Sequence, residues 1–160
     1  QRAAGKVRSQ GIDFEVSGAL SENWNASASY TYVEAKYKQD ANEDLEGEYF
    51  DQTKPRHLYK LWTRYRLDDG PLAGASIGLG VQGASQSASG AASATVAARE
   101  QNSYAVVKLQ LGYQFNKQVD VNLDINNLFD SKYYTRLGGT NTYNTYGDPR
   151  NMALTLRARY

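Results

Sequence analysis

The feature that most constrains this chain is an alternation of apolar and polar residues that recurs along most of its length. A period of two is typical of β-strands, because successive side chains of a strand point to opposite faces of the sheet. The alternating stretches are residues 12–20, 24–32, 59–67, 73–81, 105–115, 119–126 and 152–160. The sequence therefore predicts an all-β fold of about seven antiparallel strands.

The two faces of these stretches differ sharply in charge. The apolar face contains 35 positions and no charged residue, and Thr63 is its one clearly polar member. The opposite face contains 29 positions, of which ten are charged. One face must therefore meet an apolar medium and the other must meet water. The mean hydropathy of −0.66 averages these two faces with polar loops, so it conceals the apolar face.

The connections between the stretches alternate between short and long. The short ones cover residues 21–23, 68–72 and 116–118, and the long ones cover roughly 39–55, 83–103 and 128–150. We expect Leu20 to pair with Trp24 and Phe115 with Val119, which keeps the apolar faces in register. Short turns at one end, long loops at the other and strands of about nine residues are typical of transmembrane β-barrels of the bacterial outer membrane.

Aromatic side chains cluster near both ends of the apolar face. Rings with an apolar body and a polar tip gather at the two headgroup levels around membrane barrels. We expect two aromatic girdles in contact with outer-membrane lipid, one beside the short turns and one toward the long loops. The first holds Trp24, Tyr113 and Phe115, and the second holds Tyr30 and Tyr32.

Composition and motif searches argue against other classes of protein. The chain has no cysteine, one histidine and a net charge of +1, which disfavours thiol chemistry, histidine metal sites, catalytic triads and a nucleic-acid partner. The glycines within residues 78–83 match a nucleotide-binding pattern, but they lie inside an alternating stretch. The acidic residues between Asp40 and Asp51 lack the glycine and glutamate of an EF-hand loop. We therefore expect no enzyme and no metal site, and assign His57 a structural hydrogen bond near the rim.

The number of stretches suggests that the barrel is larger than this chain. Seven is odd, whereas single-chain bacterial barrels have even numbers of strands. The chain also starts without a signal peptide and stops at the last residue of a predicted strand. We expect residues 1–160 to be the C-terminal part of a larger barrel. The final alternation resembles the signal that the barrel-assembly machinery reads, carried by Leu154, Leu156 and Tyr160.

Several motifs resemble TonB-dependent ferric-siderophore receptors of the outer membrane, in that family's order. They are residues 7–15, 24–32, 54–62, 126–134 and 146–151. The terminal Tyr160 departs from the phenylalanine or tryptophan that is more usual there. The resemblance implies a 22-stranded barrel plugged by an N-terminal domain, of which this chain holds the last seven strands. It implies import of a ferric siderophore, driven by the TonB complex through the plug region, with no covalently bound cofactor.

Candidate functional residues fall into two groups. Tyrosine, phenylalanine and arginine near the rim could bind a ferric siderophore by stacking and charge. These are Tyr49, Phe50, Arg56, Arg136, Tyr143 and Tyr146. A basic row on the wet face either docks the plug or is simply hydrated, and consists of Lys60, Arg64 and Arg66. On the same face we expect cross-strand ion pairs of Asp120 and Asp124 with Lys108, Arg157 and Arg159.

Two other functions share part of this pattern. A passive porin-like barrel would show the same alternation but would have no plug. A soluble β-sandwich module would instead bury the apolar face against a second sheet.

Overall fold

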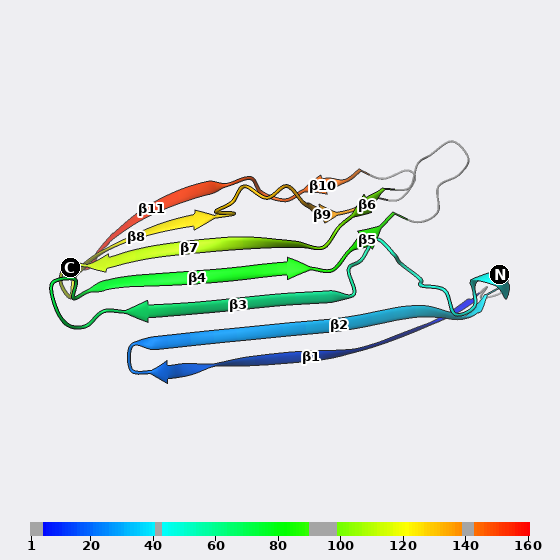
Figure 1. The fold of residues 1–160 in the computed structure, drawn as a ribbon, viewed down its shortest axis with the longest axis horizontal. Helices are drawn as coiled ribbons and strands as arrows, with labels where there is room; N and C mark the ends of the chain where they lie inside the picture. The colour runs from blue at the N-terminus through cyan, green and yellow to red at the C-terminus, as the bar shows by residue number, and fades with distance from the viewer. Residues whose placement is uncertain (1–4, 41–42, 90–98, 139–142) are drawn as a thin grey trace.

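The fold is one open antiparallel sheet of seven strands, shown in Figure 1 in the order β1-β2-β3-β4-β7-β8-β11. The computed structural model describes residues 5–40, 43–89, 99–138 and 143–160. The strands are β1 (Gly5–Ser21), β2 (Trp24–Asp40), β3 (His57–Arg66), β4 (Ala75–Ala84), β7 (Tyr104–Gln114), β8 (Val119–Asn126) and β11 (Asn151–Ala158). The seven-stranded antiparallel prediction is thus confirmed for the main sheet.

Four further strands, which the sequence did not predict, lie within the long loops. They form two ribbons of two strands each and are β5 (Ser87–Ala88), β6 (Glu100–Gln101), β9 (Tyr134–Arg136) and β10 (Thr145–Tyr146). A 3-10 turn, η1 (Glu43–Leu45), lies in the first long loop. Pieces this short carry no alternation that a sequence search can detect. No helix among the described residues is long and apolar enough to cross a membrane.

The register of the sheet places the predicted apolar residues on one face. One row across four strands pairs Ala28 with Leu61, Leu61 with Val81, and Val81 with Val107. Paired residues share a face of the sheet, so these apolar side chains lie side by side. The sequence prediction of one apolar and one wet face is therefore confirmed.

In this sheet the large apolar side chains are exposed, whereas a soluble domain would bury them. The exposed fraction is 67% for Ile12 and 73% for Leu154, both on the apolar face. Within the described ranges, the buried hydrophobic residues are only Ala84, Val106 and Leu137. An uncovered apolar face of this extent requires an apolar medium against it. This arrangement argues against the β-sandwich, because no second sheet among the described residues covers the face.

The two ends of the sheet differ as predicted. The short turns and the C-terminus lie at the left of Figure 1, and the long loops lie at the right. Phe115 N donates to Val119 O at 3.0 Å, as the expected pairing requires. The first turn is different, because Trp24 pairs with Ser21 rather than with Leu20, and the register is irregular between Ala19 and Ser21. The extra residue makes a bulge, which period-two reasoning does not anticipate.

The first two strands are much longer than predicted, at 17 residues each. The alternation search stopped at Ile12 and Tyr32 because the apolar face becomes polar beyond them. The ladder nevertheless continues, pairing Gly11 with Val33 and Arg8 with Lys36. Membrane exposure therefore ends before the strands do.

The other strand ends are displaced by up to three residues from the prediction, most clearly in β4. Gly74, predicted in that strand, belongs to the preceding turn with φ +91. A Cβ atom at Gly74 would lie 2.5 Å from Gln114 O. Glycine is therefore required at this position for two reasons, which are the positive φ and the lack of room for a Cβ atom.

A buried side-chain amide at the start of the third long loop bonds to both ends of that loop. Asn127 is 2% exposed and has φ 51, a conformation that asparagine tolerates better than most residues. Its Nδ2 donates to Ser131 O at 2.9 Å and to Asp148 O at 3.0 Å, and its Oδ1 accepts from Ser131 N at 2.8 Å. One side chain thus joins both ends of a loop of about twenty residues. This explains the asparagine in the penultimate-strand motif.

Two glycines of β1 provide a matched test of close strand approach. A Cβ atom at Gly11 would collide with the carbonyl oxygen of Tyr32, whereas one at Gly18 would meet nothing within 4 Å. We expect Gly11→Ala to destabilise the barrel by about 1–3 kcal/mol. Gly18→Ala should change stability by less than about 0.5 kcal/mol. The measurement is the heat-modifiability midpoint of the full-length protein on gels, and equal midpoints for the two variants would contradict the register.

Asn127 and its neighbour Asn126 provide a second matched pair. Asn127→Ala leaves buried loop groups without partners and should destabilise the loop by about 2–3 kcal/mol. Among the described residues, the Asn126 side chain bonds only the exposed Asn151 side chain, at 2.9 Å, so Asn126→Ala should cost less than about 1 kcal/mol. Hydrogen exchange across residues 128–138 of the full-length protein measures the difference. Similar exchange rates in both variants would show that Asn127 does not hold the loop.

Candidate functional site

The first long loop folds back along β2 and positions the first of the rim candidates. Tyr37 N donates to Glu48 O at 3.0 Å, and Phe50 N donates to Ala35 O at 2.9 Å. Tyr49 forms an isolated antiparallel bridge with Lys36. Strand-like alternation therefore sends the neighbouring Tyr49 and Phe50 side chains to opposite faces.

Tyr49 and Arg56 meet in a compact cationic and aromatic cluster. Arg56 Nη1 donates to Tyr49 Oη at 2.5 Å, and its guanidinium carbon lies 4.5 Å from the centre of the tyrosine ring. Lys36 Nζ lies 4.9 Å from the same ring. Lys36 is already paired with Glu34 at 2.6 Å, so Arg56 is the cation of this cluster that leaves positive charge for an anionic ligand, and Tyr49 supplies the ring. Phe50 instead packs on Tyr37, with ring centres 5.3 Å apart.

The rim hollow, of about 330 Å³, opens between the first two long loops. Its lining includes the predicted Tyr49 and Arg56. Sequence reasoning missed its other members, which are Asp51, Gln52, Lys54, Gln86, Ser87, Ala88, Glu100, Gln101 and Asn102. Their residue types are common in any polar loop, so nothing in the sequence distinguished them.

The second and third loops are joined by one glutamine. Gln101 Oε1 accepts from Tyr134 N at 2.5 Å, and its Nε2 donates to Tyr134 O at 3.0 Å. The side-chain amide thereby bonds both backbone groups of one residue, as a neighbouring strand would. The two small ribbons are consequently coupled to each other at the rim.

The remaining rim candidates lie apart from the rim hollow. Tyr146 contacts Tyr134, with hydroxyl oxygens 3.1 Å apart, and this hydrogen bond raises the pKa of the Tyr134 hydroxyl. Arg136 pairs with Thr145 in the β9–β10 ribbon. Tyr143 is 93% exposed. The structure therefore brings together two of the six predicted residues.

A second hollow, of about 460 Å³, lies on the wet face below the rim; we call it the lumen hollow. Trp62 is central to its wall, because its ring covers Gly78 and Gly80, where a Cβ atom would lie 2.7 Å and 2.8 Å from ring carbons. Lys108 Nζ lies 5.9 Å from the centre of this ring. The glycines that match a nucleotide motif thus make room for a neighbouring tryptophan.

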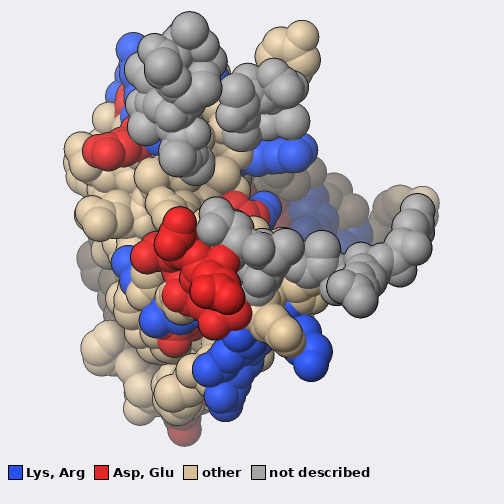
Figure 2. Space-filling view, turned by 90° about the vertical axis from the view of Figure 1, so that its right-hand side faces the viewer, with Lys and Arg blue, Asp and Glu red and all other residues tan. Residues whose placement is uncertain are grey.

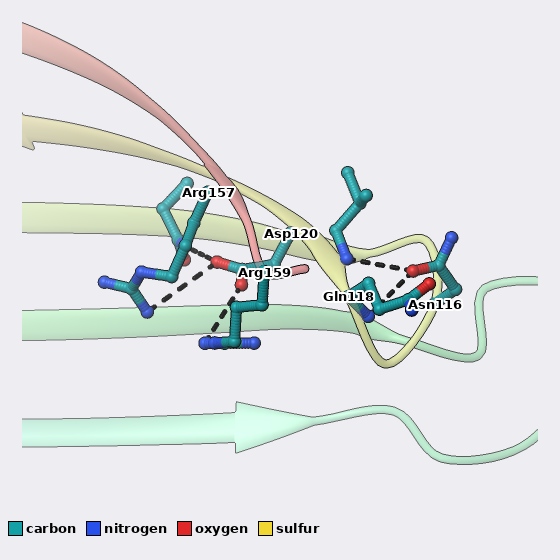
Figure 3. A network of polar contacts seen from close by, with 7 residues as sticks. Asn116, Gln118, Asp120, Arg157 and Arg159 are labelled. Atoms are coloured by element: carbon teal, nitrogen blue, oxygen red, sulfur yellow. Dashed lines mark hydrogen bonds and ion pairs between the residues drawn. The ribbon is translucent and has the colours of Figure 1, made fainter.

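The predicted cross-strand ion pairs are present, and Figure 3 shows those of Asp120. Its carboxylate lies 3.4 Å from the Arg159 guanidinium and 4.0 Å from that of Arg157. Lys108 Nζ lies 3.0 Å from Asp124. Each such partly exposed pair stabilises the sheet by at most about 1 kcal/mol. These pairs therefore contribute more to the register of the strands than to the stability of the sheet.

The three residues of the basic row differ in whether a carboxylate lies within ion-pair distance. Arg66 forms a bidentate pair with Asp68 at 2.5 and 3.0 Å in the following turn, and these hydrogen bonds lower the pKa of Asp68. Arg64 Nη2 donates to Ser76 Oγ at 3.1 Å. Neither Arg64 nor Lys60 forms an ion pair with any described residue. Of the three cations of the row, Lys60 and Arg64 therefore have no carboxylate partner among the described residues.

The acidic residues of the first long loop are exposed, and Figure 2 shows a patch of acidic side chains at the end formed by the long loops. The described acidic residues of that loop are Glu43, Asp44, Glu46, Glu48 and Asp51. No group of three histidine, cysteine or carboxylate side chains in the described ranges is arranged to hold a metal ion.

The aromatic residues of the apolar face pair at both of its ends. Trp24 Nε1 donates to Thr63 Oγ1 at 2.6 Å, which accounts for the one polar residue of this face. Tyr113 and Phe115 meet edge to face with centres 4.9 Å apart. At the loop end, Tyr30 and Tyr32 flank His57. The Tyr30 hydroxyl lies 2.8 Å from His57 Nδ1, and the Tyr32 ring centre lies 5.0 Å from the imidazole. The structural hydrogen bond predicted for His57 is confirmed.

Comparison with known proteins assigns this architecture to a family. Residues 1–128 match the family described as TonB dependent receptor-like, beta-barrel. The ferric-pyoverdine receptor PbuA of Pseudomonas sp. strain M114 is 36% identical over 159 residues, which cover 98% of this chain and 19% of that protein. The ferrichrome outer membrane transporter/phage receptor of Escherichia coli K12 is 33% identical over 147 residues, covering 89% of this chain and 18% of that protein.

Solved structures agree with this assignment. A Pseudomonas aeruginosa FpvA complex with a heterologous ferric pyoverdine has a TM-score of 0.81 and 26% identity, covering 95% of this chain and 19% of that one. The ferric-catecholate import receptor Fiu of E. coli K12 also has a TM-score of 0.81 with 26% identity, covering 98% of this chain and 21% of that one. The chain spans about a fifth of the length of these proteins. The alternating faces, the asymmetric ends and these matches together show that the chain belongs to the TonB-dependent receptor family of outer-membrane β-barrels.

Proposed function

We propose that the protein containing this chain imports a ferric siderophore across the bacterial outer membrane, energised through the TonB complex. The observation that carries this proposal is the similarity over nearly the whole chain to receptors named for ferric pyoverdine. Transport of this kind needs recognition and a path but no covalent step, so no residue here is assigned a catalytic role. A passive porin-like barrel is disfavoured, because the matching family consists of receptors.

The rim hollow supports recognition of the ligand. Ferric siderophores are often anionic and can be aromatic, and the Tyr49–Arg56 cluster offers both complementary groups. Tyr49 and Arg56 are therefore the preferred ligand contacts among the six candidates. Phe50, Arg136, Tyr143 and Tyr146 would contribute only if the ligand also reaches beyond this hollow.

We propose further that residues 1–160 are the C-terminal part of a 22-stranded plugged barrel. The outer edges of β1 and β11 have no backbone partner among the described residues, and open edges in lipid leave polar groups unsatisfied. Strands elsewhere in the protein would pair with both edges. Leu154, Leu156 and Tyr160 retain their proposed role as the assembly signal, and all three side chains are exposed.

The function is tested by uptake of iron-55 into cells that carry the full receptor as their only siderophore receptor. We expect uptake of a ferric pyoverdine, with loss of uptake when TonB is absent or the proton gradient is dissipated. The control is ferric chloride without siderophore, which should give background counts. Equal uptake with and without TonB would support the porin-like alternative instead.

Substitution of Tyr49 tests the rim hollow. We expect Tyr49→Ala to weaken binding of the transported ferric siderophore by about tenfold, because it removes the ring and the partner of Arg56. Tyr49→Phe keeps the ring and should weaken binding less. Leu72→Ala, an exposed position at the opposite end, is the control. Fluorescence titration of the purified full receptor gives the Kd, and an unchanged value for Tyr49→Ala would exclude the rim hollow.

The unpaired cations of the basic row make a separate prediction about the plug. We propose that Lys60 and Arg64 pair with plug carboxylates, whereas Arg66 is already occupied by Asp68. Arg64→Gln in the full receptor should speed hydrogen exchange of the plug about fivefold, as loss of a pair of about 1 kcal/mol implies. Arg66→Gln should leave plug exchange unchanged. Equal effects of the two variants would favour simple hydration of the row.

A further inference from the structure

The β9–β10 ribbon, at the loop end of the sheet in Figure 1, brings two tyrosine side chains together. Tyr134 of β9 and Tyr146 of β10 are partners in the antiparallel register. Their ring centres lie 4.5 Å apart with the ring planes inclined by 35°, and Tyr134 Oη donates to Tyr146 Oη at 3.1 Å. Because both the ring centres and the hydroxyl ends are close, the ring edges beside the two hydroxyls lie next to each other.

Hydrogen bonds from neighbouring segments fix the backbone that carries this pair. Gln101 of the second loop bonds the N–H and the C=O of Tyr134 at 2.5 and 3.0 Å. Thr135 Oγ1 donates to Thr145 O at 3.2 Å, which joins the two strands beside the pair. The two rings therefore stay in contact for as long as the ribbon is formed.

The pair is open to solvent and differs in this from a second tyrosine pair nearby. Tyr146 is 66% exposed, and Tyr134 is partly exposed. The rings of Tyr104 and Tyr133 also lie close, with centres 4.6 Å apart, but the Tyr133 ring packs on Gly147 so tightly that no Cβ atom would fit there. Within the described ranges, Tyr134 and Tyr146 are the tyrosines whose hydroxyls bond to each other.

Two phenols in this arrangement can be joined by oxidation. A one-electron oxidant removes an electron and a proton from each hydroxyl and leaves two phenoxyl radicals. The radicals combine by forming one carbon–carbon bond between the ring positions beside the hydroxyls, and the hydrogen on each of these carbons then moves to the phenol oxygen of its own ring. The pair loses two electrons and two protons overall. These reduce one hydrogen peroxide, whose oxygen–oxygen bond breaks, to two water molecules.

We propose that Tyr134 and Tyr146 are an oxidative modification site, at which hydrogen peroxide acting through a haem peroxidase joins the two rings as dityrosine. Long loops mark the extracellular end of an outer-membrane barrel, so the ribbon faces the medium from which peroxide and peroxidases arrive. The register and the hydroxyl contact select which tyrosines react, and solvent exposure gives the oxidant access. Unlike a disulfide, the carbon–carbon bond is not broken by thiols.

The cross-link fixes the third loop next to the second. Tyr134 is bonded to Gln101, which lines the rim hollow, whereas neither tyrosine of the pair lines it. A covalent bond between β9 and β10 removes conformational freedom from the opened ribbon, so local opening becomes rarer. The modification therefore stiffens the rim without occupying the rim hollow, and it requires no siderophore.

The test is treatment of the full-length protein, folded in detergent, with hydrogen peroxide and a haem peroxidase. The monomer band is then digested with trypsin and analysed by tandem mass spectrometry. Cleavage after Arg136 separates the two tyrosines into peptides 133–136 and 137–150. We expect these peptides to be joined through Tyr134 and Tyr146, and to weigh two hydrogen atoms less than their sum. Without peroxide they should remain separate.

Two substitutions within one peptide provide the matched control. Tyr146→Phe removes a hydroxyl that must be oxidised and should abolish the joined product. Tyr143→Phe removes a tyrosine of the same peptide that is 93% exposed, and it should leave the product unchanged. Heat-modifiability confirms that each variant is a folded barrel. Equal amounts of product from the two variants, or a linkage through Tyr143 or Tyr133 in the unsubstituted protein, would overturn the proposal.

Two further measurements use the unsubstituted protein and so do not depend on how a variant folds. Unfolding by heat in detergent before oxidation should remove most of the product, because the ring contact depends on the fold. Hydrogen exchange of residues 134–136 should slow by at least about tenfold in the cross-linked protein, because the bond closes a short loop. An undiminished product after unfolding would show random coupling, and unchanged exchange would show that the bond does not hold the ribbon. Either result contradicts the proposal.

Discussion

In every strand of this sheet, alternate side chains point to opposite faces, one toward lipid and the other toward the lumen. The hydrogen-bonded register between strands fixes which side chains point to which face. A slip of one residue between two strands would exchange their faces, sending charges such as Asp120 or Arg64 into hydrocarbon. The uninterrupted register from β2 to β8 prevents this. Because lipid cannot satisfy backbone groups, the same ladder is also the condition for lying in the membrane. The wall, the hollows and the loops all depend on this pairing.

On this scaffold, the wet face gains its shape from close contacts rather than from a core. Trp62 lies flat where Gly78 and Gly80 leave room, and ion pairs of Asp120 and Asp124 join β7, β8 and β11. These contacts produce a smooth polar wall with a hollow below the rim.

The rim adds recognition, and its parts are coupled. Asn127 joins both ends of the third loop, and Gln101 binds the third loop to the second. The Tyr49–Arg56 cluster of the first loop faces the second loop across the rim hollow. Lys36 of β2 lies against the Tyr49 ring, with its Nζ 4.9 Å from the ring centre, so the long strand supports this cluster.

Period-two alternation alone was enough to predict the seven main strands, their faces, the asymmetric ends and the partners of Asp120 and Asp124. Three of the six pairings, β1–β2, β3–β4 and β7–β8, cross short turns that leave little choice of register, and across the long loops the parity of the two faces limits which residues can pair. Only the tertiary structure decided how far β1 and β2 extend, which ring covers Gly78, and which of six rim candidates meet. The meeting of the rim candidates depends on loops that fold back without any periodicity, whereas the length of the first hairpin and the position of the Trp62 ring over β4 depend on contacts between paired strands. The face to which a strand side chain points follows directly from the order of the residues. Loop contacts instead depend on which distant backbone and side-chain groups can hydrogen-bond to one another.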